Sequence, residues 1–379
     1  MTGGQPLVVL AAGGTGGHVF PAEALAAELL TRGCRLALVT DRRGGDLGST
    51  LAGVETHRIQ AGGLAGKGLA ARMRGGVELG LGTLQARRLL SRLAPRVVIG
   101  FGGYASVPTM MASTLGGYRT ALHEQNAVLG RANRLLARRV GLIATSFDVS
   151  EGIPPEAAGR AVHTGMPVRA DFAAARTRTY PPLDEDGPVS LLVLGGSQGA
   201  RAFSEVIPKA MGRLSESLRQ RLSIAQQCRP EDLGGARVAY ARAGLTAELA
   251  PFFDDVPERM AGAHLVIARA GASTVAELTA VGRPAILVPY PFAIDDHQSA
   301  NAHAVDEAGA GWLMPQDAFT ADSLASRLEA LFALPATLDR AASCAGAAGS
   351  PEAASRLADV VFELIGSNGG DDAEGRRAA

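Results

Sequence analysis

The stretch of this sequence most suited to chemistry places a histidine directly after a run of glycines. Gly13 to Gly17 reads Gly-Gly-Thr-Gly-Gly, and His18 follows. Glycines let a ligand approach the backbone closely, and free amides at a helix start favour an anion, so a phosphate or pyrophosphate is the expected ligand. The unperturbed pKa of histidine suits proton transfer near neutral pH. A tight strand-to-helix turn and an ordinary surface histidine are the structural alternatives.

Two further loops of the first half carry glycines or adjacent polar side chains. The loop Gly100–Pro108 could bind a second phosphate or could simply be a turn. His123–Asn126 reads His-Glu-Gln-Asn, and four adjacent polar side chains are more typical of a site than of a helix cap. Asn126 could nevertheless cap a helix that begins near Val128.

The second half of the chain repeats the glycine-rich pattern. Gly195–Ala200 offers Ser197 and backbone amides at a helix start, which again favours a phosphate. In the next glycine-containing stretch, residues 268–278, Glu277 either accepts hydrogen bonds from a ribose diol or closes a capping box with Thr274. The two roles are compatible only if the helix begins earlier, near Ala272.

Short apolar runs precede these loops and predict the strands that position them. Strands that alternate with helices predict an α/β fold with two doubly wound, Rossmann-like parallel sheets, whose ligands bind outside the carboxyl ends of the strands. We expect helices over residues 22–30, with Pro21 as the first helical residue, and over residues 201–214. The expected strands are residues 7–11, 35–40, 96–99, 120–122, 189–194, 264–268 and 285–289.

The length of 379 residues predicts two domains, because one core rarely holds so many residues. We expect an N-terminal domain over residues 1–164 and a C-terminal domain over residues 165–345. A last helix is expected within residues 346–365, starting at Ser350-Pro351. The polar tail, residues 366–379, is expected to be disordered.

The charge of the chain is balanced, with 37 basic and 37 acidic residues, so no nucleic-acid partner is expected. Arginines concentrate in the first half, at 72–96 and 131–139, which suits an anionic surface or ligand unless it is only a solvated face. Neither a signal peptide nor a membrane-length apolar run is found, so we expect a soluble cytoplasmic protein. Three well-separated cysteines, Cys34, Cys228 and Cys344, predict neither a metal site nor a disulfide framework.

Taken together and in this order, the motifs resemble the MurG family of peptidoglycan synthesis, glycosyltransferase family 28. The resemblance covers the chain except its tail and is carried by GGTGGHVFPA, GFGGYASVP, LHEQN, GMPVR, GGSQGA, and ARAGASTVAEL through DDHQSANA. It implies the GT-B fold, in which two Rossmann-like domains face each other across a cleft and the last helix returns to the N-terminal domain. It also implies inverting transfer of GlcNAc from UDP-GlcNAc to the 4-hydroxyl of MurNAc in undecaprenyl-pyrophosphoryl-MurNAc-pentapeptide, which converts lipid I into lipid II.

The resemblance also assigns roles to residues that match the family motifs. Donor sugar, uracil, ribose and donor phosphates are expected at Thr15, Gly16, Gly17, Asn126, Arg169, Ser197, Phe253, Ala272, Ser273, Thr274, Val275, Ala276, Glu277 and Gln298. Of these, Asn126 and Gln298 would contact the sugar, the backbone of Phe253 the uracil, and Glu277 the ribose diol. The acceptor pyrophosphate is expected at Gly13, Gly14, Gly102, Gly103 and Tyr104.

Catalysis in this scheme needs one general base and no bound cofactor. His18 is the candidate base and Glu124 the alternative, and the sequence does not decide between them. No metal is expected, since the consecutive residues Asp295, Asp296 and His297 would rarely converge on one ion. Two departures from the family pattern are Met166 before Pro167 in the linker, where asparagine is common, and His297, where some members have glutamine.

A membrane-lipid acceptor requires peripheral contact with the cytoplasmic side of the cell membrane, and contacts with other cell-wall synthesis proteins are conceivable. An apolar face with a basic rim is expected on one amphipathic helix, unless that helix merely faces the core. Its residues would be Val77, Leu79, Leu81, Leu84, Leu89, Leu90 and Leu93, with Arg87, Arg88 and Arg92.

Other functions remain open from the residues alone. A glycolipid glycosyltransferase or a UDP-GlcNAc 2-epimerase would share the fold, and a non-catalytic nucleotide-sugar binder would need neither His18 nor Glu124. A dinucleotide-dependent dehydrogenase is disfavoured because Val19 breaks the G-x-G-x-x-G fingerprint, and the loop lacks the lysine of a Walker A motif.

Overall fold

The computed structural model describes residues 5–13, 16–41, 49–62, 69–148, 150–184, 186–196 and 199–366. Contacts divide the chain into two compact units. The first unit contains the described residues within Met1–Gln125, Leu129–Pro167 and Glu352–Ala379, and the second contains Asn126–Val128 and Val168–Pro351. The chain therefore enters the second unit for three residues, directly after Gln125, and returns to the first unit before leaving it again after Pro167.

The first unit is built on a seven-stranded parallel sheet in the order β3-β2-β1-β4-β5-β6-β7. Successive side chains of a strand point to opposite faces, and here both faces are buried. Val8 and Leu10 belong to the core on one face, and Val9 belongs to the core on the other. The strands are β1 (Leu7–Ala11), β2 (Arg35–Asp41), β3 (Glu55–Ile59), β4 (Val97–Gly100), β5 (Arg119–Glu124), β6 (Leu142–Thr145) and β7 (Ala161–His163).

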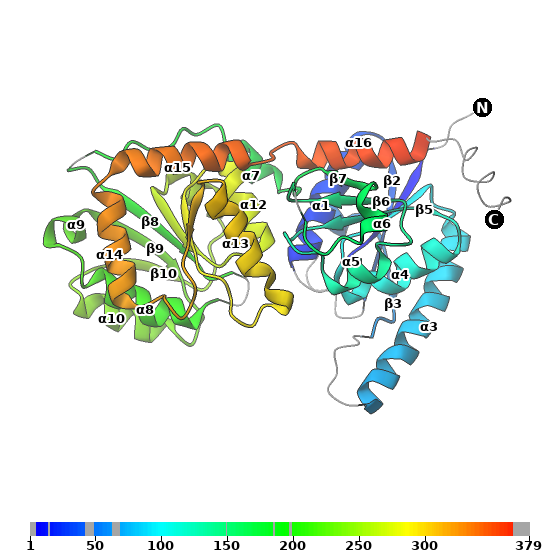
Figure 1. The fold of residues 1–379 in the computed structure, drawn as a ribbon, viewed down its shortest axis with the longest axis horizontal. Helices are drawn as coiled ribbons and strands as arrows, with labels where there is room; N and C mark the ends of the chain where they lie inside the picture. The colour runs from blue at the N-terminus through cyan, green and yellow to red at the C-terminus, as the bar shows by residue number, and fades with distance from the viewer. Residues whose placement is uncertain are drawn as a thin grey trace. The chain divides into compact units, whose positions relative to one another are not determined.

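Helices cover both faces of this sheet (Figure 1). α1 (Gly16–Thr31) and α16 (Ala353–Gly366) pack on the face of Val8, where Leu357, Ala358 and Val361 of α16 are buried. The core on the opposite face includes side chains from α3 (Leu69–Leu93), α4 (Gly103–Leu115) and α5 (Arg131–Leu136). The other helices described in this unit are α2 (Ser49–Ala52) and α6 (Pro155–Ala158).

The second unit contains a six-stranded parallel sheet in the order β10-β9-β8-β11-β12-β13. Its strands are β8 (Val189–Leu194), β9 (Leu222–Gln227), β10 (Ala247–Ala250), β11 (Leu265–Ala268), β12 (Ala285–Leu287) and β13 (Gly311–Leu313). Its helices are α7 (Ala170–Ala175), α8 (Arg201–Met211), α9 (Glu216–Arg221), α10 (Leu233–Arg242), α11 (Val256–Gly262), α12 (Ala272–Val281), the short 3₁₀ helix η1 (Ile294–Asp296), α13 (His297–Glu307), α14 (Ala321–Phe332) and α15 (Pro335–Ala348).

The predicted fold class, two doubly wound parallel sheets, is confirmed. In each sheet the strand order reverses at one crevice, between β1 and β4 in the first unit and between β8 and β11 in the second. Ligands of such sheets bind outside the carboxyl ends of the strands at this crevice. The glycine-rich stretches of the sequence follow these four strands, so the fold brings the predicted loops to the positions where this architecture binds ligands.

Three local predictions are wrong. Pro21 is not the first residue of its helix, because α1 already begins at Gly16 and Pro21 lies inside it. Asn126 does not cap a helix near Val128, because α5 begins at Arg131. Leu89 and Leu90 are 8% and 0% exposed and belong to the core, so they cannot form part of a membrane-facing surface. Apart from Gly366, which ends α16, the predicted tail lies outside the described residues.

Candidate active site

His18 is the third residue of α1 and reaches a loop more than a hundred residues away. Its Nδ1 lies 3.0 Å from Oε1 of Gln125, the residue directly after β5. The amide nitrogen of Gln125 donates to the backbone oxygens of Phe101 and His123, each at 2.9 Å. The side chain of Gln125 is 2% exposed, so these bonds hold it inside the first unit. The two motifs singled out in the sequence therefore meet through a residue that received no role.

His123 is fully buried beside Gln125. Its Nε2 lies 3.2 Å from the backbone oxygen of Gly165, and its Nδ1 lies 3.1 Å from the amide nitrogen of Gln125. Burial lowers the pKa of His123 to about 4, and the bond to Gly165 opposes this shift only in part. His123 is therefore neutral at physiological pH and acts as a fixed hydrogen-bonding group.

The glycines around His18 are required by the packing of the protein on itself. Gly103 has a φ of +69°, and a Cβ added there would lie 3.1 Å from Cδ2 and 3.3 Å from Nε2 of His18. A Cβ added at Gly13 would lie 2.7 Å from Oγ1 of Thr40 and 2.8 Å from Cβ of Ala105. The turn alternative thus explains part of the glycine content, and binding of the acceptor pyrophosphate at Gly13, Gly102 and Gly103 stays a prediction.

Glu124, the alternative base, has partners of a different kind. It is 1% exposed, and its Oε2 accepts hydrogen bonds from the backbone N–H of Gly130 at 2.9 Å and from Nδ2 of Asn133 at 2.8 Å. Both donors belong to the start of α5, where a negative charge is favoured by the helix dipole. Glu124 therefore performs the stabilising role at this helix that the sequence offered to Asn126.

Asn126 belongs to the second unit, where it pairs with Asn301 of α13. Nδ2 of Asn301 donates to Oδ1 of Asn126 at 3.2 Å and to the backbone oxygen of Ala270 at 3.0 Å. Oδ1 of Asn301 accepts from the backbone N–H of Ala127 at 2.8 Å. Asn301 is 0% exposed, so this one side chain orients the amide that was predicted to contact GlcNAc.

Glu277 lies in the second turn of α12, which begins at Ala272. The capping box with Thr274 is therefore wrong, and the helix start that allows a ribose contact is the one observed. Burial raises the pKa of the Glu277 carboxyl to about 8, and the positive charge of Arg169 acts in the opposite direction. Arg169 immediately precedes α7, and its guanidinium lies 4.9 Å from the ring centre of Phe172.

The remaining donor residues that the structure describes also lie in the second unit. Phe253 is 5% exposed, with the guanidinium of Arg259 4.3 Å from its ring centre. Oε1 of Gln298, in α13, accepts from the backbone N–H of Tyr290 at 2.9 Å. Ala272 and Val275 of α12 are buried, whereas Ser273, Thr274 and Ala276 are partly exposed. Gly14, Thr15 and Ser197 lie outside the described residues, and Gly16 and Gly17 begin α1.

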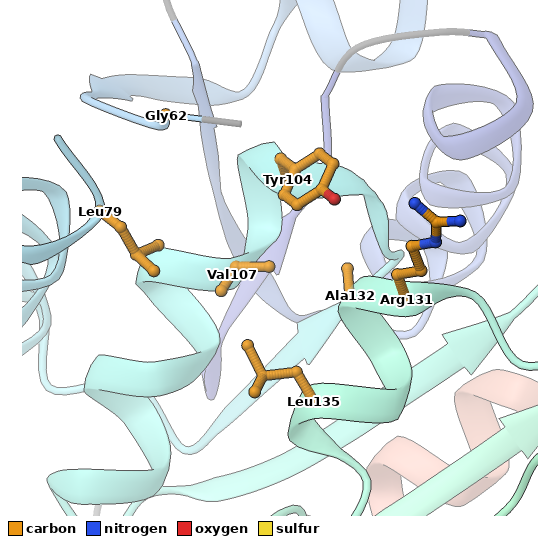
Figure 2. Close-up of a pocket in the computed structure, with 7 residues that line it drawn as sticks. All are labelled: Gly62, Leu79, Tyr104, Val107, Arg131, Ala132 and Leu135. Atoms are coloured by element: carbon orange, nitrogen blue, oxygen red, sulfur yellow. The ribbon is translucent and has the colours of Figure 1, made fainter. Parts of the chain in front are cut away.

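A pocket of about 190 Å³ opens beside the glycine turn before α4. Figure 2 shows Tyr104 and Arg131 on one side of this pocket and aliphatic side chains around the rest. Among the described residues, no three histidine, cysteine, aspartate or glutamate side chains gather as metal ligands would. The pocket is lined by Gly62, Leu79, Tyr104, Val107, Arg131, Ala132 and Leu135.

Comparison with known proteins identifies the family. The Glycosyltransferase family 28 N-terminal domain matches residues 8–145, and the Glycosyltransferase family 28 C-terminal domain matches residues 190–357. The chain belongs to glycosyltransferase family 28. A relative from Paramagnetospirillum magneticum is 63% identical over 97% of this chain and 99% of its own length. It is named UDP-N-acetylglucosamine--N-acetylmuramyl-(pentapeptide) pyrophosphoryl-undecaprenol N-acetylglucosamine transferase.

Solved structures of other glycosyltransferase-fold proteins agree with this assignment. The MurG of Acinetobacter baumannii superposes with a TM-score of 0.78 at 30% identity, covering 94% of this chain and 99% of that protein. The predicted family and the GT-B fold are therefore confirmed. A UDP-GlcNAc 2-epimerase from Neisseria meningitidis reaches 0.66 at 10% identity, covering 95% and 100% of the two chains, and shares only the fold.

Proposed function

We propose that this family 28 glycosyltransferase transfers GlcNAc from UDP-GlcNAc to the 4-hydroxyl of MurNAc in undecaprenyl-pyrophosphoryl-MurNAc-pentapeptide, with inversion at the anomeric carbon. The products are lipid II and UDP. One observation carries the proposal: 63% identity, over 97% of the chain, to a relative named for this GlcNAc transfer. At that identity and coverage both the donor and acceptor halves of the reaction are expected to be shared.

The proposed reaction is a single displacement with His18 as the base. His18 takes the proton of the acceptor hydroxyl while its oxygen bonds to the anomeric carbon of GlcNAc, and the bond from that carbon to the β-phosphate oxygen of UDP breaks. The contact of Nδ1 with Gln125 supports His18, because it fixes the orientation of the imidazole. Glu124 is the weaker candidate, since its Oε2 is already engaged by two donors at α5.

The leaving UDP is proposed to bind in the second unit. The amino end of α12 and the guanidinium of Arg169 supply positive potential for the negative charge that develops on the diphosphate. Glu277 accepts from the ribose, the backbone of Phe253 meets the uracil, and Asn126 and Gln298 contact the sugar. No protein-bound metal or other cofactor is part of this proposal.

The acceptor is proposed to bind the first unit, with its pyrophosphate at the turn of Gly102 and Gly103. The pocket beside Tyr104 supports this placement, because its aliphatic lining suits the isoprene units that follow the pyrophosphate, and Arg131 adds a positive charge (Figure 2). None of the described helices is long and apolar enough to cross a membrane. The protein is therefore proposed to act peripherally on the cytoplasmic face, where other cell-wall synthesis proteins could contact it.

The experiment that tests this function measures UDP release from UDP-GlcNAc, with and without a short-chain lipid I analogue. UDP release only with the analogue, together with a disaccharide-lipid product, is the expected result. UDP release without any acceptor would instead indicate an epimerase that hydrolyses its substrate. Tight UDP binding without release, also with the native-length lipid, would indicate a nucleotide-sugar binder.

A further inference from the structure

We propose that Gln125 and His123 are positioning residues that fix the tautomer of His18, with the hydrogen on Nδ1 and the lone pair on Nε2. Neither residue was given a role by the sequence or by the family assignment. The tautomer itself is independent of the reaction. Its catalytic consequence rests on the proposed function, in which His18 is the base.

The orientation of the Gln125 amide follows from its neighbours. Its nitrogen lies 2.9 Å from two backbone carbonyl oxygens, those of Phe101 and His123. Carbonyl oxygens only accept hydrogen bonds, so the amide atom that faces them must be the NH₂ group. Reversing the amide would place its oxygen against both carbonyls inside a buried site, at an energetic cost. The oxygen Oε1 is therefore the atom that faces His18.

His123 strengthens this orientation from the other side. Its Nε2 faces the carbonyl oxygen of Gly165 at 3.2 Å, so Nε2 carries the hydrogen and Nδ1 carries the lone pair. That lone pair faces the amide nitrogen of Gln125 at 3.1 Å. The two hydrogens of the amide are thus shared among three acceptors, and no donor is present among them that would favour the reversed amide.

The last step places the hydrogen on His18. Oε1 of Gln125 can only accept, and it lies 3.0 Å from Nδ1 of His18. Nδ1 must therefore carry a hydrogen, and because a neutral imidazole has only one, Nε2 carries the lone pair. When Nε2 takes a proton, the bond from Nδ1 to Gln125 persists and stabilises the imidazolium.

The first experiment observes the tautomer directly in the full, unmodified chain. The protein is labelled with ¹⁵N-histidine, and two-bond ¹H–¹⁵N spectra are recorded above the titration range of His18. The His18 signals are assigned by their loss in His18→Gln. We expect a protonated-type shift for Nδ1 and an unprotonated-type shift for Nε2. The reverse pattern, or rapid averaging of the two, would overturn the proposal.

The second experiment compares two substitutions of similar length at the same site. Gln125→Met removes the acceptor for Nδ1, whereas Gln125→Glu keeps an oxygen there. We expect kcat to fall about 10²–10⁴-fold in Gln125→Met, with the KM for UDP-GlcNAc within about twofold, since the base is misoriented while donor binding is intact. We expect Gln125→Glu to recover at least about tenfold of that loss. Equal kcat values in the two variants would contradict the positioning role.

The pH profile separates positioning from a general loss of structure. In Gln125→Glu, the carboxyl oxygen that faces the carbonyls of Phe101 and His123 must carry a proton, so the neutral acid keeps its other oxygen on Nδ1 of His18. The acidic limb of kcat should therefore keep its position in Gln125→Glu and move to lower pH in Gln125→Met, which lacks the acceptor that stabilises the imidazolium. Thr120→Val is the matched control, because Thr120 lies on β5, the strand that precedes Gln125, and the substitution removes the part-buried hydrogen bond that its hydroxyl accepts from the backbone N–H of Gly141. The control should lower the melting temperature and leave the pH profile and the His18 tautomer unchanged.

The outcomes distinguish this proposal from the function on which it rests. The expected tautomer without any GlcNAc transfer would reject the proposed function and leave the positioning role standing. GlcNAc transfer together with the opposite tautomer would reject the positioning role alone. If neither Gln125 variant folds, the spectrum of the unmodified protein still decides the question.

Discussion

His18 is held through Nδ1 by Gln125, while Gly103 leaves space along the ring. Gln125 directly follows β5, and Gly103 begins α4 shortly after β4, so the parallel sheet sets the position of the imidazole. An imidazole placed in this way does not need a charged neighbour to be oriented. An amide suffices when buried carbonyls fix which of its ends faces the ring.

His18→Gln removes the proposed base while retaining a polar side chain. We expect kcat to fall by about 10²–10⁴-fold, the usual contribution of a general base, with the dissociation constant for UDP unchanged. Steady-state kinetics and calorimetry with UDP measure the two effects. His303→Gln, an exposed histidine of α13, is the control and should leave both unchanged. Near-normal turnover of His18→Gln would remove His18 from the mechanism.

The raised pKa of the Glu277 carboxyl predicts that donor binding depends on pH. Its pKa of about 8 lies above the ordinary value of 4.5, so most of the carboxyl is protonated at pH 7. Ribose hydroxyls donate best to the carboxylate, so UDP should bind more tightly as pH rises towards 8 and weaken by up to about tenfold per pH unit below it. Calorimetry across pH 6–9 measures this. Glu277→Gln should lose this component, and an unchanged slope in that variant would contradict the ribose assignment.

The same shift has a defined effect on stability. Folding raises the pKa of Glu277, so the protonated carboxyl contributes to the free energy of unfolding. This stabilisation is fully present below about pH 4.5 and is lost as pH rises through about 8. The carboxyl therefore makes folding less favourable at alkaline pH. Binding a diol there would offset that cost only in the complex.

At the scale of elements, α3 presents two different faces. Leu89 and Leu90 are buried in the core, whereas Val77, Leu81 and Leu84 are 62%, 46% and 57% exposed. Arg87 and Arg88 are also exposed on this helix. The middle of α3 thus combines apolar and basic side chains at the surface, which is the composition of a peripheral membrane contact.

Reversing the charge at Arg87 and Arg88 tests that surface. Each basic residue near an anionic bilayer contributes about 1 kcal/mol, so Arg87→Glu with Arg88→Glu should weaken binding to phosphatidylglycerol vesicles by roughly thirtyfold or more. Vesicle co-sedimentation at low salt measures the affinity of each variant for the vesicles. Arg237→Glu with Arg242→Glu, exposed on α10 of the second unit, makes the same charge change as a control. If both pairs behave alike, α3 is not the contact surface.

The helix α16 closes one face of the first sheet although it comes from the end of the described chain. Leu357 is 0% exposed against that core, and Arg119 donates to the backbone oxygens of Leu364 and Ile365 at 2.7 Å. The first unit therefore needs both ends of the chain. Its folding couples segments more than two hundred residues apart.

Leu357→Ala should destabilise the first unit by about 2–5 kcal/mol, because it removes buried methyl groups and leaves a cavity. Urea unfolding followed by hydrogen exchange in peptides of β1 and α1 reports on that unit. Glu363→Ala, at an exposed position of the same helix, should change stability by less than about 0.5 kcal/mol. A loss confined to peptides of the second unit would contradict the assignment of α16 to the first core.

At the scale of the whole molecule, the two units carry separate parts of the proposed chemistry. The described residues proposed for uracil, ribose, phosphate and sugar, namely Asn126 and those from Arg169 to Gln298, belong to the second unit. His18, Glu124 and the pocket beside Tyr104 belong to the first. Each unit has its own sheet and its own core, so a ligand of one unit can stabilise it without stabilising the other.

UDP should therefore protect the two units unequally. At a concentration one hundred times its dissociation constant, a ligand stabilises the folded form that binds it by about 2.7 kcal/mol. We expect hydrogen exchange to slow in peptides of α12 and β11 and to stay unchanged in those of β1 and β2. Adenosine diphosphate at the same concentration is the control for non-specific diphosphate binding. Protection centred on the first unit would reverse the proposed placement of the donor.

The sequence by itself determined the architecture and the positions of the loops. Buried parallel strands need continuous apolar runs, and β1 and β8 coincide with the predicted ranges 7–11 and 189–194. Glycine-rich loops follow such strands because the chain must turn sharply into a helix. Local periodicity and turn chemistry are properties of neighbouring residues, so they can be read without knowing the fold.

Tertiary structure alone decided which polar side chains meet. His18 and Gln125 are 107 positions apart, and Asn126 and Asn301 are 175 apart, so no local pattern encodes either pair. The same holds for Glu124, which local reasoning offered as a base and which binds the start of α5. A buried hydrogen bond is selected by the geometry of the packed sheet, in which the carboxyl ends of distant strands meet at one edge. That juxtaposition exists only once the strands have paired.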